Sequence, residues 1–80
     1  MPGVPREPDP DWVIRKRQAI GNRVREQREF ADLTQEELEQ RAGVKRLTIQ
    51  RIESGATDAR IGWLLRIADT LGIHVTELLR

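Results

Sequence analysis

Residues 33–55, LTQEELEQRAGVKRLTIQRIESG, contain the strongest local structural signals of the chain. Thr34 stands three residues before Glu37, the spacing of a capping box, in which each side chain accepts a hydrogen bond from the other residue's backbone N–H. A helix is therefore predicted to start at Thr34 or Gln35. Gly43 is expected to end it, because glycine adopts the left-handed conformation of a helix C-terminus at little cost. The pattern predicts a short helix followed by a tight turn.

The second half of this stretch predicts another helix, from Val44 to Ser54, stopped by Gly55. At 100° per residue, Ile49 and Ile52 share one face of that helix and would be buried. The opposite face carries Leu47, Gln50, Arg51 and Ser54. An apolar residue among polar and charged neighbours on an outward face is unusual for a purely structural helix, so this face is the first candidate for a function.

Short blocks of sequence extend this pattern in a fixed order. They are Thr34-Gln35-Glu36-Glu37-Leu38, Ala42-Gly43-Val44, Thr48-Ile49, Arg51-Ile52-Glu53-Ser54-Gly55, Leu64-Leu65-Arg66-Ile67-Ala68, Leu71-Gly72 and Glu77-Leu78-Leu79. Together they resemble the helix-turn-helix domain of the phage repressor and Cro (XRE-type) family. The resemblance spans about Ile20 to Leu79 and implies an all-α, five-helix, repressor-like domain that binds double-stranded DNA as a transcriptional regulator, expected to be a homodimer on a palindromic site.

The rest of the chain fits one small domain with a tail. Residues 1–10 hold four prolines and no apolar period, so they are predicted to be a flexible N-terminal tail, and residues 11–80 to be the domain. A first helix is predicted from Trp12 to about Phe30, with Asp11 as its cap. Its apolar stripe consists of Val13, Ile20, Val24 and Ala31. This helix is extended, because the resemblance does not account for residues 12–19. A fourth helix is predicted to bury Ile61, Leu64, Leu65, Ala68 and Leu71.

Charge is distributed unevenly along a chain whose net charge is only +1. Residues 12–30 and 45–55 are net positive, whereas residues 31–44 are net negative. Clustering of this kind allows a nearly neutral domain to present a basic face to phosphates.

The composition argues against catalysis. The sequence has a single histidine and no cysteine, and no histidine–carboxylate spacing resembles a metal site. We therefore expect no enzyme activity, no metal and no cofactor. Neither a signal peptide nor a stretch of membrane-spanning length is recognisable, so a cytoplasmic protein without membrane contact is expected.

The resemblance also implies roles for individual residues. The residues expected to contact DNA bases are Lys45, Arg46, Leu47, Gln50 and Arg51. Gln35 is expected from the resemblance to contact a DNA phosphate. Three further residues are expected to contact phosphates because of their own side chains: Arg23 by its charge, and Ser54 and Thr57 as hydrogen-bond donors. Arg28 and Glu53 are expected to form an ion pair beneath the DNA-binding surface.

One alternative from another functional class stays open at this point. The chain could be a protein-interaction module, such as an antitoxin or an adaptor, that keeps the fold without reading bases and binds a toxin or another regulator. The near-neutral charge and the outward Leu47 suit such a role. For contact with a second copy of the chain, Trp12, Ile73, Leu78 and Leu79 are expected to be the exposed apolar groups.

Overall fold

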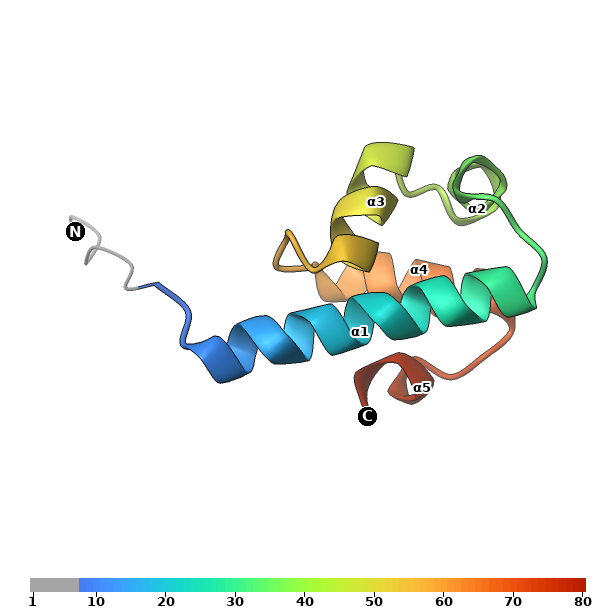
Figure 1. Cartoon of the computed structure of the whole chain (residues 1–80). Helices are drawn as coiled ribbons and strands as arrows, with labels where there is room; N and C mark the ends of the chain where they lie inside the picture. The colour runs from blue at the N-terminus through green and yellow to red at the C-terminus, as the bar shows by residue number, and fades with distance from the viewer. Residues whose placement is uncertain (1–7) are drawn as a thin grey trace, which may run out of the picture.

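A computed structural model of the chain describes residues 8–80, which form five helices around one core (Figure 1). The helices are α1 (Asp11–Phe30), α2 (Gln35–Ala42), α3 (Arg46–Ser54), α4 (Ile61–Leu71) and α5 (Thr76–Leu79). The described part of the chain includes no strand, and the predicted all-α, five-helix class is confirmed. Of the predicted tail, residues 1–7 lie outside the described residues, and residues 8–10 precede α1 without regular structure.

The longest helix, α1, contacts α3, α4 and α5. Its first turns project beyond the other helices (Figure 1). The prediction that Asp11 caps α1 is wrong by one position, since Pro10 is the N-cap and Asp11 is the first helical residue. A carboxylate in the first turn still interacts favourably with the positive end of the helix dipole. Of the predicted stripe, Val24 is fully buried, whereas Ala31 is exposed because it follows the end of the helix.

The capping box at the start of α2 is present. The Glu37 N–H donates to Thr34 Oγ1 and the Thr34 N–H donates to Glu37 Oε1, both at 3.0 Å. Gly43 ends the helix with φ 70°, in the left-handed region that side chains other than glycine rarely adopt. The start of the next helix was predicted two residues too early, because Val44 and Lys45 belong to the turn and α3 begins at Arg46. Val44 is buried, so it anchors the turn in the core.

All five helices contribute to the core, and α2 packs on α3 and α4 and adds Leu38 and Ala42 to it. The largest fully buried side chains are Leu38, Ile49, Ile67, Leu78 and Val24. On α4 the buried positions are Leu64, Ile67 and Ala68. The prediction that Ile61 and Leu65 are buried is therefore wrong: they flank the inner face and are 60% and 49% exposed. Leu78, predicted to be exposed, is fully buried because α5 packs against α1.

Gly21 brings α1 and α3 into close contact. A Cβ atom at this position would overlap the backbone carbonyl oxygens of Ile52 and Glu53. Gly21 is buried inside a continuous helix, so it does not fray α1 as an isolated helical glycine could. Its role is to set the distance between the longest helix and the helix with the unusual outward face.

Candidate nucleic-acid interface

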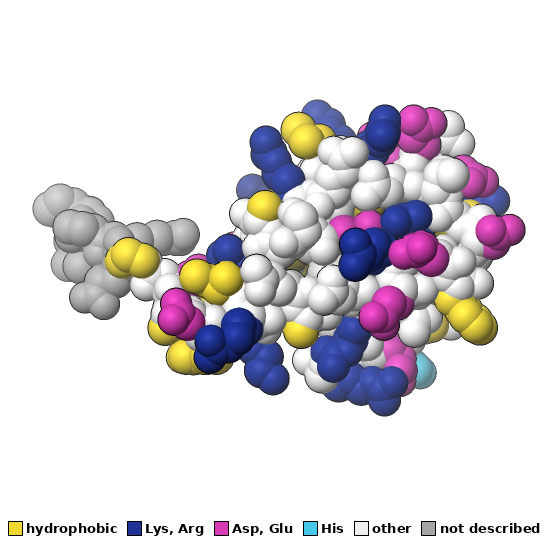
Figure 2. Space-filling view, in the orientation of Figure 1, with side chains coloured by type: hydrophobic (Ala, Val, Ile, Leu, Met, Phe, Trp, Pro, Cys, Tyr) yellow, Lys and Arg dark blue, Asp and Glu magenta, His cyan; other side chains and the backbone are white. Residues whose placement is uncertain are grey.

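The outward face of α3 is open to solvent. Leu47 is 55% exposed, and Gln50 and Arg51 are exposed beside it. On the opposite face, Ile49 and Ile52 are buried, which fixes the rotation of α3 about its axis. Figure 2 shows basic side chains gathered around α3 and acidic side chains over α2. No part of the described chain covers this face, so a duplex can approach it.

Lys45 and Arg46 stand at the N-terminal end of α3, both exposed. Lys45 occupies the N-cap position but its side chain forms no cap hydrogen bond. Two carboxylates of α2 contact Arg46 instead. The Arg46 N–H donates to Glu39 Oε2 at 2.8 Å, and Arg46 Nη1 donates to Glu36 Oε1 at 3.1 Å. Sequence analysis missed these contacts, and the only available signal was the absence of a capping side chain at Lys45.

Beneath the surface, Arg28 of α1 and Glu53 of α3 form a two-pronged ion pair. Arg28 Nε donates to Glu53 Oε2 at 2.8 Å, and Arg28 Nη2 donates to Glu53 Oε1 at 3.0 Å. Glu53 is the one buried charged residue among those described, 6% exposed. Arg28 Nη1 also donates to the backbone oxygen of Leu33 at 2.8 Å. Hydrogen bonding to Glu53 raises the pKa of Arg28 above its ordinary value, although burial opposes the shift.

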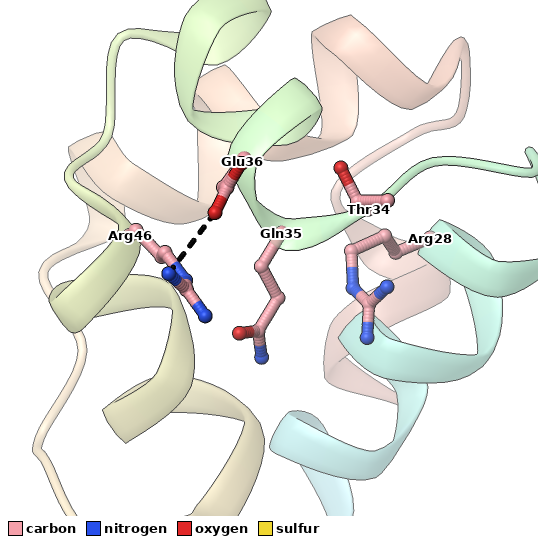
Figure 3. Close-up of a pocket in the computed structure, with 5 residues that line it drawn as sticks. All are labelled: Arg28, Thr34, Gln35, Glu36 and Arg46. Carbon is pink, nitrogen blue, oxygen red and sulfur yellow. Dashed lines mark hydrogen bonds and ion pairs between the residues drawn. The ribbon is translucent and has the colours of Figure 1, made fainter.

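Gln35 joins this buried network. Its Nε2 donates to Glu53 Oε1 at 3.2 Å, which holds the first residue of α2 against α3. Gln35 lines an open hollow, and its side chain points from α2 into the space between Arg46 and Arg28 (Figure 3). The hollow is lined by Arg28, Thr34, Gln35, Glu36 and Arg46. The start of a helix, where backbone N–H groups lack helical partners, faces this hollow and suits an anion such as a phosphate.

The other three candidates for phosphate contact are in different places. Ser54 is exposed at the end of α3, where its hydroxyl donates to the backbone oxygen of Arg51 at 3.2 Å. Thr57 is half-buried in the loop after α3. Arg23 comes two residues after Gly21, so it points about 200° away from the α3-facing side of α1. The structure thus groups Gln35, Ser54 and Thr57 near α3 but does not group Arg23 with them.

The extension of α1 contacts the far end of α3. Arg17 Nε donates to the backbone oxygen of Gly55 at 3.2 Å, and Arg17 Nη1 contacts Asp9 Oδ2 at 3.1 Å. Gln18 packs against Gly55 so closely that a Cβ atom there would lie 2.6 Å from Gln18 Cγ. The extension therefore braces the C-terminal end of α3, a role that the sequence did not reveal.

Residues 8–80 contain no cluster of three or more His, Asp or Glu side chains that could hold a metal ion. In the same part of the chain, no helix is both long enough and apolar enough to cross a membrane.

Comparisons with known proteins agree with this geometry. A family model described as a helix-turn-helix domain matches residues 19–80. Among solved structures, the chain is similar to the restriction-modification controller protein C.AhdI from Aeromonas hydrophila, with 31% sequence identity and a TM-score of 0.75. The match covers 78% of this chain and 94% of that protein. A comparison with curated proteins found no match. The chain therefore belongs to the Cro/XRE-like family of helix-turn-helix domains, which are DNA-binding transcription regulators and not enzymes.

Proposed function

We propose that α3 lies in the major groove of double-stranded DNA and that its outward face reads the edges of the bases. The exposed row of Leu47, Gln50 and Arg51, fixed by a buried underside, is the observation that carries this proposal. Arginine matches the two acceptors on the major-groove edge of guanine, glutamine matches the donor and acceptor of adenine, and leucine can contact a thymine methyl group. Lys45 and Arg46 extend the row at the end where α3 begins.

Contacts with DNA phosphates would fix the position of α3 along the duplex. Gln35, at the N-terminus of α2, and Ser54 and Thr57, after the reading positions, flank α3 on two sides. Contacts of this kind fix the orientation of the protein on the duplex but carry no sequence information. Arg23 would reach phosphate only through a different face of α1, so it is the weakest member of the set.

We also propose that the protein binds as a homodimer on a palindromic site, as a regulator comparable with the controller protein it resembles. Trp12 and Leu79 are exposed apolar side chains that a second copy could cover, and Ile73 is half-buried. Leu78 is excluded from such an interface because it is buried in the core.

The competing function is a protein-interaction module that binds a toxin or another regulator and does not read bases. The exposed Leu47 is the observation that favours it, since an apolar side chain in the centre of a surface suits a protein partner.

A duplex-shift assay at about 50 mM and about 200 mM salt distinguishes these functions, because phosphate-led binding weakens steeply with salt. We expect the affinity to fall at least about tenfold between the two conditions. If duplex binding is absent at both concentrations, the DNA-reading proposal is wrong and the interaction module becomes the better account.

A further inference from the structure

The start of α3 is held by α2. Lys45 at the N-cap offers no side-chain oxygen, and the first helical N–H, that of Arg46, is instead bound by Glu39 Oε2 at 2.8 Å. A carboxylate at the N-terminus of a helix also interacts favourably with the helix dipole. Glu39 therefore satisfies one of the N–H groups left free at the start of α3 and fixes the backbone of Arg46 relative to α2.

A second carboxylate fixes the other end of the same residue. Glu36 lies three positions before Glu39, on the same side of α2, and its Oε1 accepts a hydrogen bond from Arg46 Nη1 at 3.1 Å. Figure 3 shows Glu36 extending from α2 towards the Arg46 guanidinium at the edge of the hollow. Arg46 is thus held at its backbone and at the tip of its side chain.

This arrangement leaves most of the guanidinium available. An arginine carries five N–H donors on one rigid plane, and Glu36 accepts from only one nitrogen of Arg46. The Arg46 side chain is 51% exposed, and its other donors bind no group within residues 8–80. Glu36 therefore limits the directions in which the Arg46 guanidinium can point. The N–H donors on another edge of the guanidinium stay available for the two acceptors of guanine.

We propose that Glu36 is a positioning residue for base reading: it holds the Arg46 guanidinium in the orientation that discriminates between bases. This inference rests on the proposed function, because orientation matters only if Arg46 meets a base edge. Glu36 itself is 67% exposed and carries a negative charge at the surface that phosphates would approach. Glu36 therefore weakens binding to DNA of any sequence. It also increases the ratio of affinities between the base that Arg46 reads and the other bases.

Two variants separate these opposing effects. Glu36→Gln and Glu36→Ala remove the same charge, so both are expected to bind a random duplex more tightly and to a similar extent. Only Glu36→Ala also removes the oxygen that accepts from Arg46. We expect Glu36→Ala to reduce discrimination at the base read by Arg46 by about three- to tenfold, with Glu36→Gln closer to the wild type. Melting temperatures of both variants, compared with each other, control for the charge lost from the first turn of α2.

The test measures the affinities of the full chain for a duplex selected from a random pool and for each of its single-base variants. It uses the wild type, the two Glu36 variants, Arg46→Ala, and Arg46→Ala combined with Glu36→Ala. The proposal predicts that Glu36→Ala acts on the same base position as Arg46→Ala and has no further effect on base preference when Arg46 is absent.

Two results overturn the proposal in distinguishable ways. If Arg46→Ala abolishes preference at one position and Glu36→Ala leaves it intact, the positioning role is wrong and the proposed function stands. If Arg46→Ala has no effect on preference at any position, the assignment of Arg46 to a base is wrong, and the role of Glu36 falls with it.

Discussion

The Arg28–Glu53 pair is the residue-scale feature with the largest expected effect on stability. Replacing Arg28 with alanine would leave the nearly inaccessible Glu53 carboxylate without its main partner. Removing one partner of a buried ion pair typically lowers the free energy of unfolding by about 3–5 kcal/mol. We expect Arg28→Ala to lower the free energy of unfolding by about 3 kcal/mol in urea denaturation, because Gln35 still donates to Glu53.

Arg25→Ala is the matched control. Arg25 lies on the same helix and faces Glu29 across 3.8 Å, but both side chains are more than half exposed. Pairs of this kind contribute about 0–1 kcal/mol. Equal losses of stability in Arg28→Ala and Arg25→Ala would show that burial of the Glu53 pair has no special importance.

The capping box of α2 predicts a pH dependence. Hydrogen bonds from the Thr34 backbone and hydroxyl lower the pKa of Glu37 below its ordinary value. A carboxylate whose pKa is lower in the folded state stabilises the protein above the unfolded pKa of 4.5, and this contribution is lost as the pH falls through the folded pKa.

Thermal unfolding of the wild type and Glu37→Gln at neutral and acidic pH tests this linkage. The amide oxygen of glutamine can still accept from the Thr34 N–H but does not titrate over this range. The variant should therefore lose less stability than the wild type between neutral pH and pH values below 4.5. Identical losses would mean that Glu37 does not contribute to acid unfolding.

At the scale of elements, Gly21 sets how closely α1 approaches α3. An alanine methyl group would meet backbone oxygens of Ile52 and Glu53, which cannot move without shifting α3. We expect Gly21→Ala to destabilise the fold by about 1–3 kcal/mol and to weaken DNA binding, although alanine is the better helix former. Urea denaturation and duplex titration measure the two effects.

Gly62→Ala provides the control for Gly21→Ala. Gly62 is also helical, but nothing lies within 4 Å of a Cβ atom placed there. Its replacement should be neutral or stabilising by up to about 1 kcal/mol. If Gly21→Ala behaves in the same way, the close approach of the two helices is not needed.

Prediction from sequence succeeded where a local pattern determines the structure. The capping box and the left-handed glycines at positions 43 and 55 depend on neighbouring residues only, so the end of α2 and the end of α3 were placed correctly. The start of α3 was placed two residues early because Val44, which suits either a helix or an anchored turn, is used to anchor the turn.

Features that depend on packing between helices were harder to predict. The burial of Leu78 follows from the way α5 meets α1, and the exposure of Ile61 follows from the placement of α4. The contacts of Glu36 and Glu39 with Arg46 join residues ten and seven positions apart, respectively, across a turn whose path no local pattern specifies. The outward face of α3 and its buried underside of Ile49 and Ile52 were predictable, whereas the contacts that hold the two ends of α3 were not.

For the whole molecule, the described helices form a scaffold that presents one surface. α1 contacts the C-terminal part of α3 at Gly21 and Arg28, α2 holds the start of α3, and Arg17 in the α1 extension holds the end of α3. These contacts restrict α3 already in the free protein. α3 therefore loses less conformational freedom on binding, and this favours affinity. The scaffold is consistent with a helix that must meet a partner in one fixed orientation.

The central claim is that the outward face of α3 reads base edges, and Arg51→Ala tests it most directly. The measurement is the ratio of affinities for a duplex selected by the wild type and for a random duplex, at one salt concentration. Arg51 is exposed, and its side chain forms no hydrogen bond or ion pair within residues 8–80, so its loss should leave the fold intact. We predict that the ratio falls by about 5- to 160-fold, corresponding to about 1–3 kcal/mol, because loss of the positive charge weakens binding to the random duplex less than it weakens binding to the selected duplex. An unchanged ratio, or a wild type that selects no sequence, would contradict the claim.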